Sequence, residues 1–342
     1  LYLAPGYAPG YRIGRLQRLF DEAASAGPLT IEQFKAWQAN NQLLDADVLT
    51  PFILESFDNA SAPGAAPELT ALIADPRIGE AVGRLAAWNF DTPTGIDQGF
   101  DPGDDPGWVG PPNLPEIEAS VASTIYATWR GQVVQRVVDD TLNGLLVPLG
   151  GFAPGSAQAM TALRNLLDRY PVNGGTGASL INFFEVPGVA DQDVAKDIIL
   201  LESLRDALDL LASNDFAPAF GNSTDLDDYR WGKLHRIVFA HPLGGPFSVP
   251  AAGAPDNVSP ELPGYARAGG MGALDASAHR ARADGLNEFM FGSGPSRRFV
   301  ATMTPNGPDA VQVIPGGENG NLGSPNRTCL LYTSPSPRDF KY

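Results

Sequence analysis

The sequence is almost devoid of cysteine and poor in histidine, with one Cys and three His in 342 residues. The single cysteine, Cys329, lies near the end, so the residues before it form no disulfide bonds and offer no thiolate for catalysis or metal binding. No stretch approaches the roughly 20 uninterrupted apolar residues of a membrane-spanning helix, and the best candidate, 194–211, carries several charges. The sequence therefore excludes a disulfide scaffold and a membrane-spanning protein.

Basic residues are also scarce. The chain has 23 Lys and Arg against 39 Asp and Glu, a formal net charge of −16, and no basic stripe interrupts the acidic surface. Such a surface repels phosphate backbones and anionic lipid. We expect no nucleic-acid partner and no membrane partner.

The apolar content, 43%, is enough for one large hydrophobic core or two modest ones in a chain of this length. The 38 Gly and 31 Pro stand between periodic apolar segments and form no single low-complexity tract. This distribution predicts long surface loops on a packed body.

The first two thirds of the chain have helical periodicity. Thr30 and Gln33 have the spacing of a capping box, and Asp75 followed by Pro76 is a second helix-start signal. Elsewhere, apolar residues recur at spacings of three and four, as in amphipathic helices. The expected helices cover 13–27, a segment beginning at Thr30, a segment beginning at Asp75, 115–146, 156–170 and 191–212.

After residue 214 the pattern changes to that of strands. The segment 233–241 is β-rich, and two further β-rich segments, 299–303 and 310–314, flank the turn residues 305–308. Between them lies a loop of about fifty residues, 243–295, which is longer than compact domains usually contain. We expect this loop to cover a surface supplied partly by chain that is missing here.

These patterns predict an α+β protein with two regions. Residues 1–216 form a helical region, and 217–328 form a β-rich part with a long Gly/Pro loop. The last residues, 329–342, read CLLYTSPSPRDFKY and resemble a translated sequencing adapter, so we interpret them as a non-native tail. The alternative is a genuine disordered Ser/Pro tail.

Four motifs carry a resemblance to a known family. They are Pro9-Gly10-Tyr11-Arg12 before an apolar helix, 229–236 (YRWGKLHR) continuing to His241-Pro242-Leu243, 292–298 (GSGPSRR), and 314–320 (IPGGENG) followed by 323–325 (GSP). In this order they resemble the penicillin amidase family. The resemblance covers most of residues 5–326, and the chain has Glu318-Asn319 where that family usually has Gln-Ser.

The resemblance implies an N-terminal-nucleophile hydrolase with an αββα sandwich, made as one precursor that cleaves itself into two subunits. This chain would be the C-terminal part of the large (β) subunit, with the sandwich incomplete. In such enzymes a serine at the start of the large subunit attacks an amide carbonyl, and its own α-amine takes the proton. That serine is absent, so we expect the chain alone to be inactive. Its expected partners are the upstream part of the large subunit and the small subunit.

The same resemblance implies a small-molecule substrate with a linear amide, of the acylated β-lactam or acyl-homoserine-lactone type, and a periplasmic or secreted location. The competing hypothesis is a non-catalytic secreted helical binding module with a β tail. We expect no cofactor and no metal in this segment, because the calcium ligands of the family lie mostly upstream.

Arg12 is the one catalytic candidate. The resemblance places it where the family has an arginine that supports the oxyanion-binding asparagine. A cation at the start of a helix opposes the helix dipole at a cost of up to about 1 kcal/mol, so a compensating contact is expected. The competing interpretation is an ordinary surface arginine.

Other candidates have structural explanations. His235 and His241 would share one face of the predicted strand, and with His279 they suggest a metal pair or a base, but structural hydrogen bonding accounts for them better. The aspartates of one glycine-rich loop suggest either a calcium loop or a solvated acidic loop, and we favour the second. Four tryptophans are interpreted as core or interface anchors. The aspartates are Asp97, Asp101, Asp104 and Asp105, and the tryptophans are Trp37, Trp88, Trp129 and Trp231.

Overall fold

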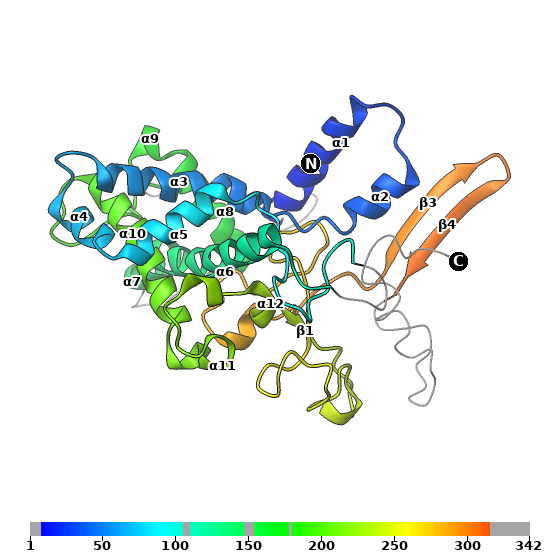
Figure 1. The fold of residues 1–342 in the computed structure, drawn as a ribbon. Helices are drawn as coiled ribbons and strands as arrows, with labels where there is room; N and C mark the ends of the chain where they lie inside the picture. The colour runs from blue at the N-terminus through cyan, green and yellow to red at the C-terminus, as the bar shows by residue number, and fades with distance from the viewer. Residues whose placement is uncertain (1–7, 105–109, 147–153, 178–179, 315–342) are drawn as a thin grey trace.

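A helical body dominates the molecule, and a long β-hairpin projects from one end of it (Figure 1). The structure is a computed structural model, and it describes residues 8–104, 110–146, 154–177 and 180–314. The interpreted tail, the family motif beyond Ile314 and Asp105 lie outside the described residues. Among the described helices, none combines the length and apolar character that crossing a membrane would require.

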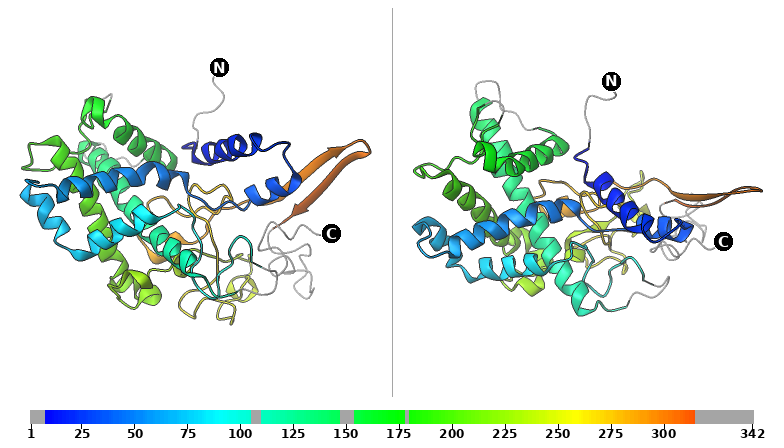
Figure 2. Two further views of the ribbon diagram at one scale, coloured as in Figure 1. Left: turned by 45° about the horizontal axis from the view of Figure 1, so that its top comes forward. Right: turned by 90° about the horizontal axis from the view of Figure 1, so that it is seen from above.

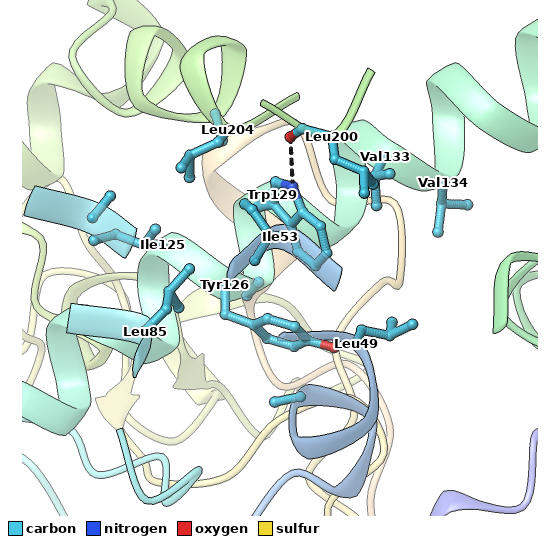
Figure 3. Close-up of a cluster of buried hydrophobic side chains, with 14 of the residues drawn as sticks. Leu49, Ile53, Leu85, Ile125, Tyr126, Trp129, Val133, Val134, Leu200 and Leu204 are labelled. Carbon is cyan, nitrogen blue, oxygen red and sulfur yellow. Dashed lines mark hydrogen bonds between the residues drawn. The ribbon is translucent and has the colours of Figure 1, made fainter. Parts of the chain in front are cut away.

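The centre of the body is formed by the helices α6 (Leu114–Val134), α10 (Gln192–Leu211) and α3 (Leu44–Ser61). α6 and α3 both pack against α10. Most of α6 is buried on every side, and its small polar side chains, such as those of Ser120 and Thr124, donate hydrogen bonds to backbone carbonyls. Trp129 is fully buried there, and its indole N–H donates a hydrogen bond of 3.1 Å to the carbonyl of Leu200 on α10 (Figure 3).

Shorter helices surround this centre and complete the core. α5 begins at Pro76 directly after Asp75, whose carboxylate accepts from the Arg77 backbone N–H as the start signal predicts. The surrounding helices are α4 (Pro67–Ile73), α5 (Pro76–Ala87), α7 (Asp140–Leu146), α8 (Ser156–Asp168), α9 (Tyr170–Asn173), α11 (Ala217–Phe220) and α12 (Trp231–Leu234).

Two N-terminal helices stand apart from the body, between it and the hairpin (Figures 1 and 2). They are α1 (Tyr11–Ala24) and α2 (Ile31–Trp37). The predicted capping box at Thr30 is present in full. Gln38, just after α2, donates a 2.9 Å hydrogen bond to the Phe299 carbonyl and so ties α2 to the base of the hairpin.

The predicted helices are all confirmed. The predicted helix 115–146 is one helical run that passes from α6 through a π-helical turn (Gln135–Asp139) into α7. α3 was not predicted, because Pro51 lies inside it and polar residues such as Asp45 and Ser56 face the core. Both features mask the apolar periodicity on which sequence reasoning depends.

The strand prediction for 233–241 is confirmed only in part. Lys233 and Leu234 belong to α12, β1 (Arg236–Ile237) pairs antiparallel with β2 (Tyr265–Ala266), and Phe239 forms an isolated antiparallel bridge with Val249. The buried Trp231 and Leu234 are on α12, so docking of apolar side chains onto the helical body overrides the local β propensity.

The hairpin prediction is confirmed. β3 (Arg298–Thr304) and β4 (Gly307–Val313) pair antiparallel in register from Arg298↔Val313 to Thr304↔Gly307. Phe299 and Met303 are exposed, Met303 to 81%, whereas Val300 is buried. The mixture of helices and small antiparallel sheets agrees with the α+β class, whereas an αββα sandwich is not seen among the described residues.

The long segment 243–295 remains irregular apart from β2 and the short 3₁₀ turns Gly245–Phe247 and Leu286–Phe289. It is nevertheless packed: Leu262, Ala273 and Phe289 belong to the same hydrophobic core as the helices. The helical body therefore supplies a surface that this loop covers.

Two helical glycines test how tightly this loop packs. A Cβ on Gly131 of α6 would lie 2.9 Å from the carbonyl oxygen of Ala283, whereas one on Gly83 of α5 meets nothing within 4 Å. We expect Gly131→Ala to destabilise the protein by about 1–3 kcal/mol through overpacking. Gly83→Ala should stabilise it by about 0.5–1 kcal/mol through helix propensity. Urea denaturation of both variants measures the difference, and a neutral Gly131→Ala would contradict the packing described.

Candidate active site

Arg12 lies in the first turn of α1, where its side chain is exposed. The N-cap, Gly10, makes no side-chain cap, and no acidic residue stands in the first turn. The Nε–H of Arg12 instead donates a 3.0 Å hydrogen bond to the carbonyl of Ala273. This carbonyl is the compensating contact that a cation at a helix N-terminus requires.

Ala273 belongs to the segment Gly269–His279, here called the glycine loop. Gly269 and Gly272 have positive φ angles of 102° and 94°, which favour glycine. The Gly269 N–H donates to the Thr92 carbonyl at 3.0 Å, and the Asp275 N–H donates to the Asn40 carbonyl at 3.0 Å. Backbone hydrogen bonds thus hold the glycine loop against the segment before α3, which contains Asn40, and the segment after α5, which contains Thr92.

A buried ion pair lies beneath this loop. Arg130 of α6 and Asp45 of α3 are 0% and 1% exposed, and their Nη1 and Oδ2 atoms are 2.9 Å apart. The same Nη1 lies 3.4 Å from the Met271 carbonyl, and a Cβ on Gly272 would lie 3.4 Å from Asp45 Oδ1. The pair therefore connects two core helices to the glycine loop, two residues before the carbonyl that holds Arg12.

Two tyrosines, Tyr126 and Tyr11, lie beside the ion pair of Asp45 and Arg130. The Tyr126 hydroxyl donates to Asp45 Oδ2 at 3.0 Å, and Tyr11, next to Arg12, is also buried. Burial, together with the charge of Asp45, raises the pKa of both hydroxyls above the ordinary tyrosine value. Both tyrosines are therefore neutral at ordinary pH.

His279 closes the cluster from the end of the glycine loop. Its Nε2 lies 2.7 Å from Nη2 of Arg130. The Met271 backbone N–H lies 3.0 Å from Nδ1, so both ring nitrogens face donors. A protonated ring has no acceptor nitrogen, so the imidazole is neutral and accepts at one of the two positions. Burial and then the neighbouring charge of Arg130 lower the pKa of His279 well below its usual value.

His235 has a different partner set. It is fully buried, with Nδ1 2.6 Å from the Arg267 carbonyl and Nε2 3.1 Å from the Ser277 carbonyl. Burial lowers its pKa, and the two carbonyls oppose this shift, because only a protonated ring can donate to both. Its ring stacks on Trp231 with centroids 5.1 Å apart and lies 5.9 Å from the ring of His279.

The third histidine is separate from these two. His241 lies beyond β1, and its Nδ1 accepts a hydrogen bond from the Leu243 backbone N–H at 3.1 Å. The expectation that His235 and His241 share a strand face is wrong, because β1 spans only two residues. Within the described parts of the chain, no three His, Cys, Asp or Glu side chains cluster in a way that could hold a metal ion. Structural hydrogen bonding accounts for all three histidines.

The acidic loop is organised by the protein itself. Asp101 accepts hydrogen bonds from the N–H and the hydroxyl of Thr94, at 2.9 and 2.5 Å. Asp104 accepts from the Asp101 N–H at 2.7 Å, while Asp97 is exposed. These hydrogen bonds stabilise the turn at Asp101. Burial raises the pKa of the Asp101 carboxyl to about 6.

The tryptophans are structural, as predicted. Trp88, Trp129 and Trp231 are buried in the core, and Trp37 packs edge-on against Phe20 with ring centroids 4.9 Å apart. Trp231 also donates from its indole N–H to the Gly269 carbonyl at 2.7 Å. It therefore supports the start of the glycine loop.

Comparison with known proteins identifies the family of the chain. A family model described as penicillin amidase matches residues 1–330. The chain belongs to the penicillin amidase family. Membership implies the N-terminal-nucleophile hydrolase superfamily and an amide-hydrolysing enzyme class. No curated protein in the comparison matches the chain.

Within this penicillin amidase chain, sequence reasoning missed the cluster of Asp45, Arg130 and His279. One signal was present: Arg130 is the one charged residue between Ala119 and Gln135 of a long helix rich in apolar residues, and Asp45 follows Leu43-Leu44. A charge embedded in an apolar helix requires a partner, because burying an unpaired ion is very unfavourable. The sequence does not indicate which partner it finds.

The ion pair can be tested by paired variants of α3. Asp45→Asn leaves Arg130 buried without a counter-charge and should cost about 3–5 kcal/mol of stability. Asp47→Asn removes a carboxylate from the same helix, where it pairs with Arg18 near the surface, and should cost less than about 1 kcal/mol. Chemical denaturation measures the free energy of unfolding of both variants. Similar losses would show that the buried ion pair stabilises the protein no more than the surface pair does.

The buried histidines predict acid sensitivity. Their pKa values are lowered in the folded state, so the unfolded chain binds more protons below about pH 6.5, and the stability they contribute is lost as the pH falls through that value. His279→Gln keeps an acceptor for Arg130 but does not titrate. Between about pH 7 and pH 5, wild type should lose about 2 kcal/mol more than this variant.

Urea titrations at the two pH values measure this difference. The opposite contribution of Asp101, whose raised pKa favours folding in acid, is common to both proteins and cancels. Equal losses in wild type and variant would contradict a neutral, buried His279.

Proposed function

We propose that this chain forms the C-terminal part of the large subunit of a penicillin-amidase-type hydrolase. The intact enzyme removes an acyl group from a linear amide, with acylated β-lactams or acyl-homoserine lactones as the substrate class. Its serine nucleophile, the α-amine that acts as base and the oxyanion-binding asparagine come from sequence upstream, and the small subunit completes the site. Family membership over residues 1–330 supports this proposal.

The observation that carries the proposal is the way Arg12 is held. Its Nε–H is occupied by the Ala273 carbonyl, and its terminal Nη groups make no hydrogen bond or ion pair with the described residues. Because a guanidinium is planar, a hydrogen bond at Nε also fixes the directions in which the Nη1 and Nη2 hydrogens point. Arg12 is thus suited to orient an asparagine side chain that binds an oxyanion.

Buried residues behind the glycine loop help to position the Arg12 guanidinium. Arg130 contacts the Met271 carbonyl, and its own position is set by Asp45 on a second helix. Preorganised donors contribute to catalysis only when the surrounding structure prevents them from moving. We therefore assign Asp45 and Arg130 as positioning residues for the glycine loop and, through it, for Arg12.

Several parts of the proposal come from the family. The intact enzyme is periplasmic or secreted, and this segment contributes no cofactor. The regions 1–216 and 217–328 act together, which is supported by a hydrophobic core that contains residues of both. The competing function, a non-catalytic helical binding module, requires no serine upstream.

The decisive experiment joins the chain to its upstream sequence. The gene should encode a Gly-Ser cleavage junction upstream of Leu1, and the processed enzyme should hydrolyse a chromogenic acyl anilide, whereas the chain alone should not. In that enzyme Arg12→Ala should lower kcat about a hundredfold or more with a smaller change in KM, because the arginine acts as charge develops.

Arg18→Ala is the matched control, since Arg18 lies on the same helix but pairs with Asp47. It should retain near wild-type kcat. An upstream sequence that lacks the junction would favour the binding module. A correctly processed Arg12→Ala enzyme within twofold of wild type would return Arg12 to the role of a surface residue.

A further inference from the structure

A pocket that is open to solvent, called the cavity below, lies where the end of α2, the glycine loop and the base of the hairpin meet. It has a volume of about 290 Å³, and its lining includes Gln38, Asp275, Arg297, Arg298 and Phe299. The hydrogen bond from Gln38 to the Phe299 carbonyl joins two of its lining residues. Three segments far apart in the sequence thus build one cavity.

The cavity wall carries two cations without counter-charges. Arg298 makes one long hydrogen bond, 3.4 Å, to the Asp275 backbone carbonyl, and Arg297 lies over the Phe299 ring with its guanidinium carbon 5.1 Å from the centroid. No carboxylate of the described residues pairs with either arginine. Burial, followed by the nearby Arg267, lowers the pKa of Arg298 to about 10, so it remains charged at neutral pH.

The one acidic residue in the lining, Asp275, forms no ion pair with either arginine. The Asp275 side chain is 3% exposed, and its Oδ1 accepts hydrogen bonds from the Ser277 N–H and hydroxyl at 3.1 and 2.6 Å. Its carboxylate therefore serves the turn of the glycine loop. The charge of Asp275 acts on Arg298 without forming an ion pair with it. In a chain with a net charge of −16, two arginines that form no ion pair with the described residues make a local site for an anion.

The rest of the lining decides what kind of anion fits. Leu274 and Pro295 are apolar, and the Phe299 ring is 47% exposed. An inorganic ion would leave this apolar surface uncovered, whereas an organic carboxylate pairs its charge with a guanidinium and covers the ring. We propose that this cavity binds a small carboxylic acid with an aromatic body, its carboxylate held by Arg298 and Arg297.

This site is separate from the proposed amide hydrolysis, because binding to the chain itself requires no serine and no turnover. It lies beside the catalytic candidate, since Leu274 follows the residue whose carbonyl holds Arg12. Success or failure of the binding experiment is therefore independent of the proposed function.

The test is calorimetric titration of the 342-residue chain with benzoate, and with benzamide as its neutral counterpart. Benzoate should bind with a dissociation constant on the order of 1 mM, as expected for a ligand of this size. Benzamide should bind at least about tenfold more weakly because it lacks the charge. Equal affinity for the two compounds, or no binding of benzoate, would overturn the proposal.

Variants locate the binding. Arg298→Gln should weaken benzoate at least about tenfold, and the exposed Arg297→Gln should weaken it about threefold. Arg280→Gln is the matched control, because Arg280 is 72% exposed, pairs with Glu288 and does not line the cavity. If Arg298→Gln does not fold, the affinity of Arg297→Gln for benzoate tests the site. Wild-type affinity in whichever of these two cavity variants fold would place benzoate elsewhere and reject the site.

Discussion

The buried ion pair between Asp45 and Arg130 is the interaction on which the candidate site depends. Removing both charges from water is costly, and a buried pair often adds little net stability over an apolar one. The pair nevertheless fixes geometry, because each partner has few alternatives inside a packed core. Tyr126 and His279 occupy further positions around it, so α3, α6 and the glycine loop are held in one arrangement.

This arrangement gives a reason for the large helical body around a single exposed candidate residue, Arg12. In a penicillin amidase the reacting groups must be positioned within a fraction of an ångström, and residues on packed helices are more precisely placed than residues on loops. Arg12 is exposed, but its anchor is a loop carbonyl that two core helices fix in turn. The irregular segment 243–295 is accordingly packed into the core at several points.

Charge is distributed unevenly over the molecule. The acidic excess of the whole chain contrasts with the uncompensated arginines at the base of the hairpin. An acidic protein lowers the local concentration of anions at its surface. A cationic cavity in such a protein therefore binds an anion through close contact and shape, with little help from long-range attraction.

Local features were predictable from the sequence because they depend on residues close together in the chain. The capping box of Thr30 and Gln33, the helix start at Asp75 and the hairpin around Asn306 all follow from neighbours within a few positions. Family motifs likewise indicated the enzyme class, and the role they suggest for Arg12 stays a prediction. Where local propensity competed with packing, as in α12, the prediction was wrong.

Only the tertiary structure decided which buried charges meet. Arg130 is separated from Asp45 by 85 positions and from His279 by 149, and no local pattern relates the three. The same holds for Arg12 and Ala273, 261 positions apart. Sequence shows that a charge inside an apolar helix needs a partner. Which partner it meets is determined by how helices and loops pack around one core, because only packing brings such distant segments within hydrogen-bond distance.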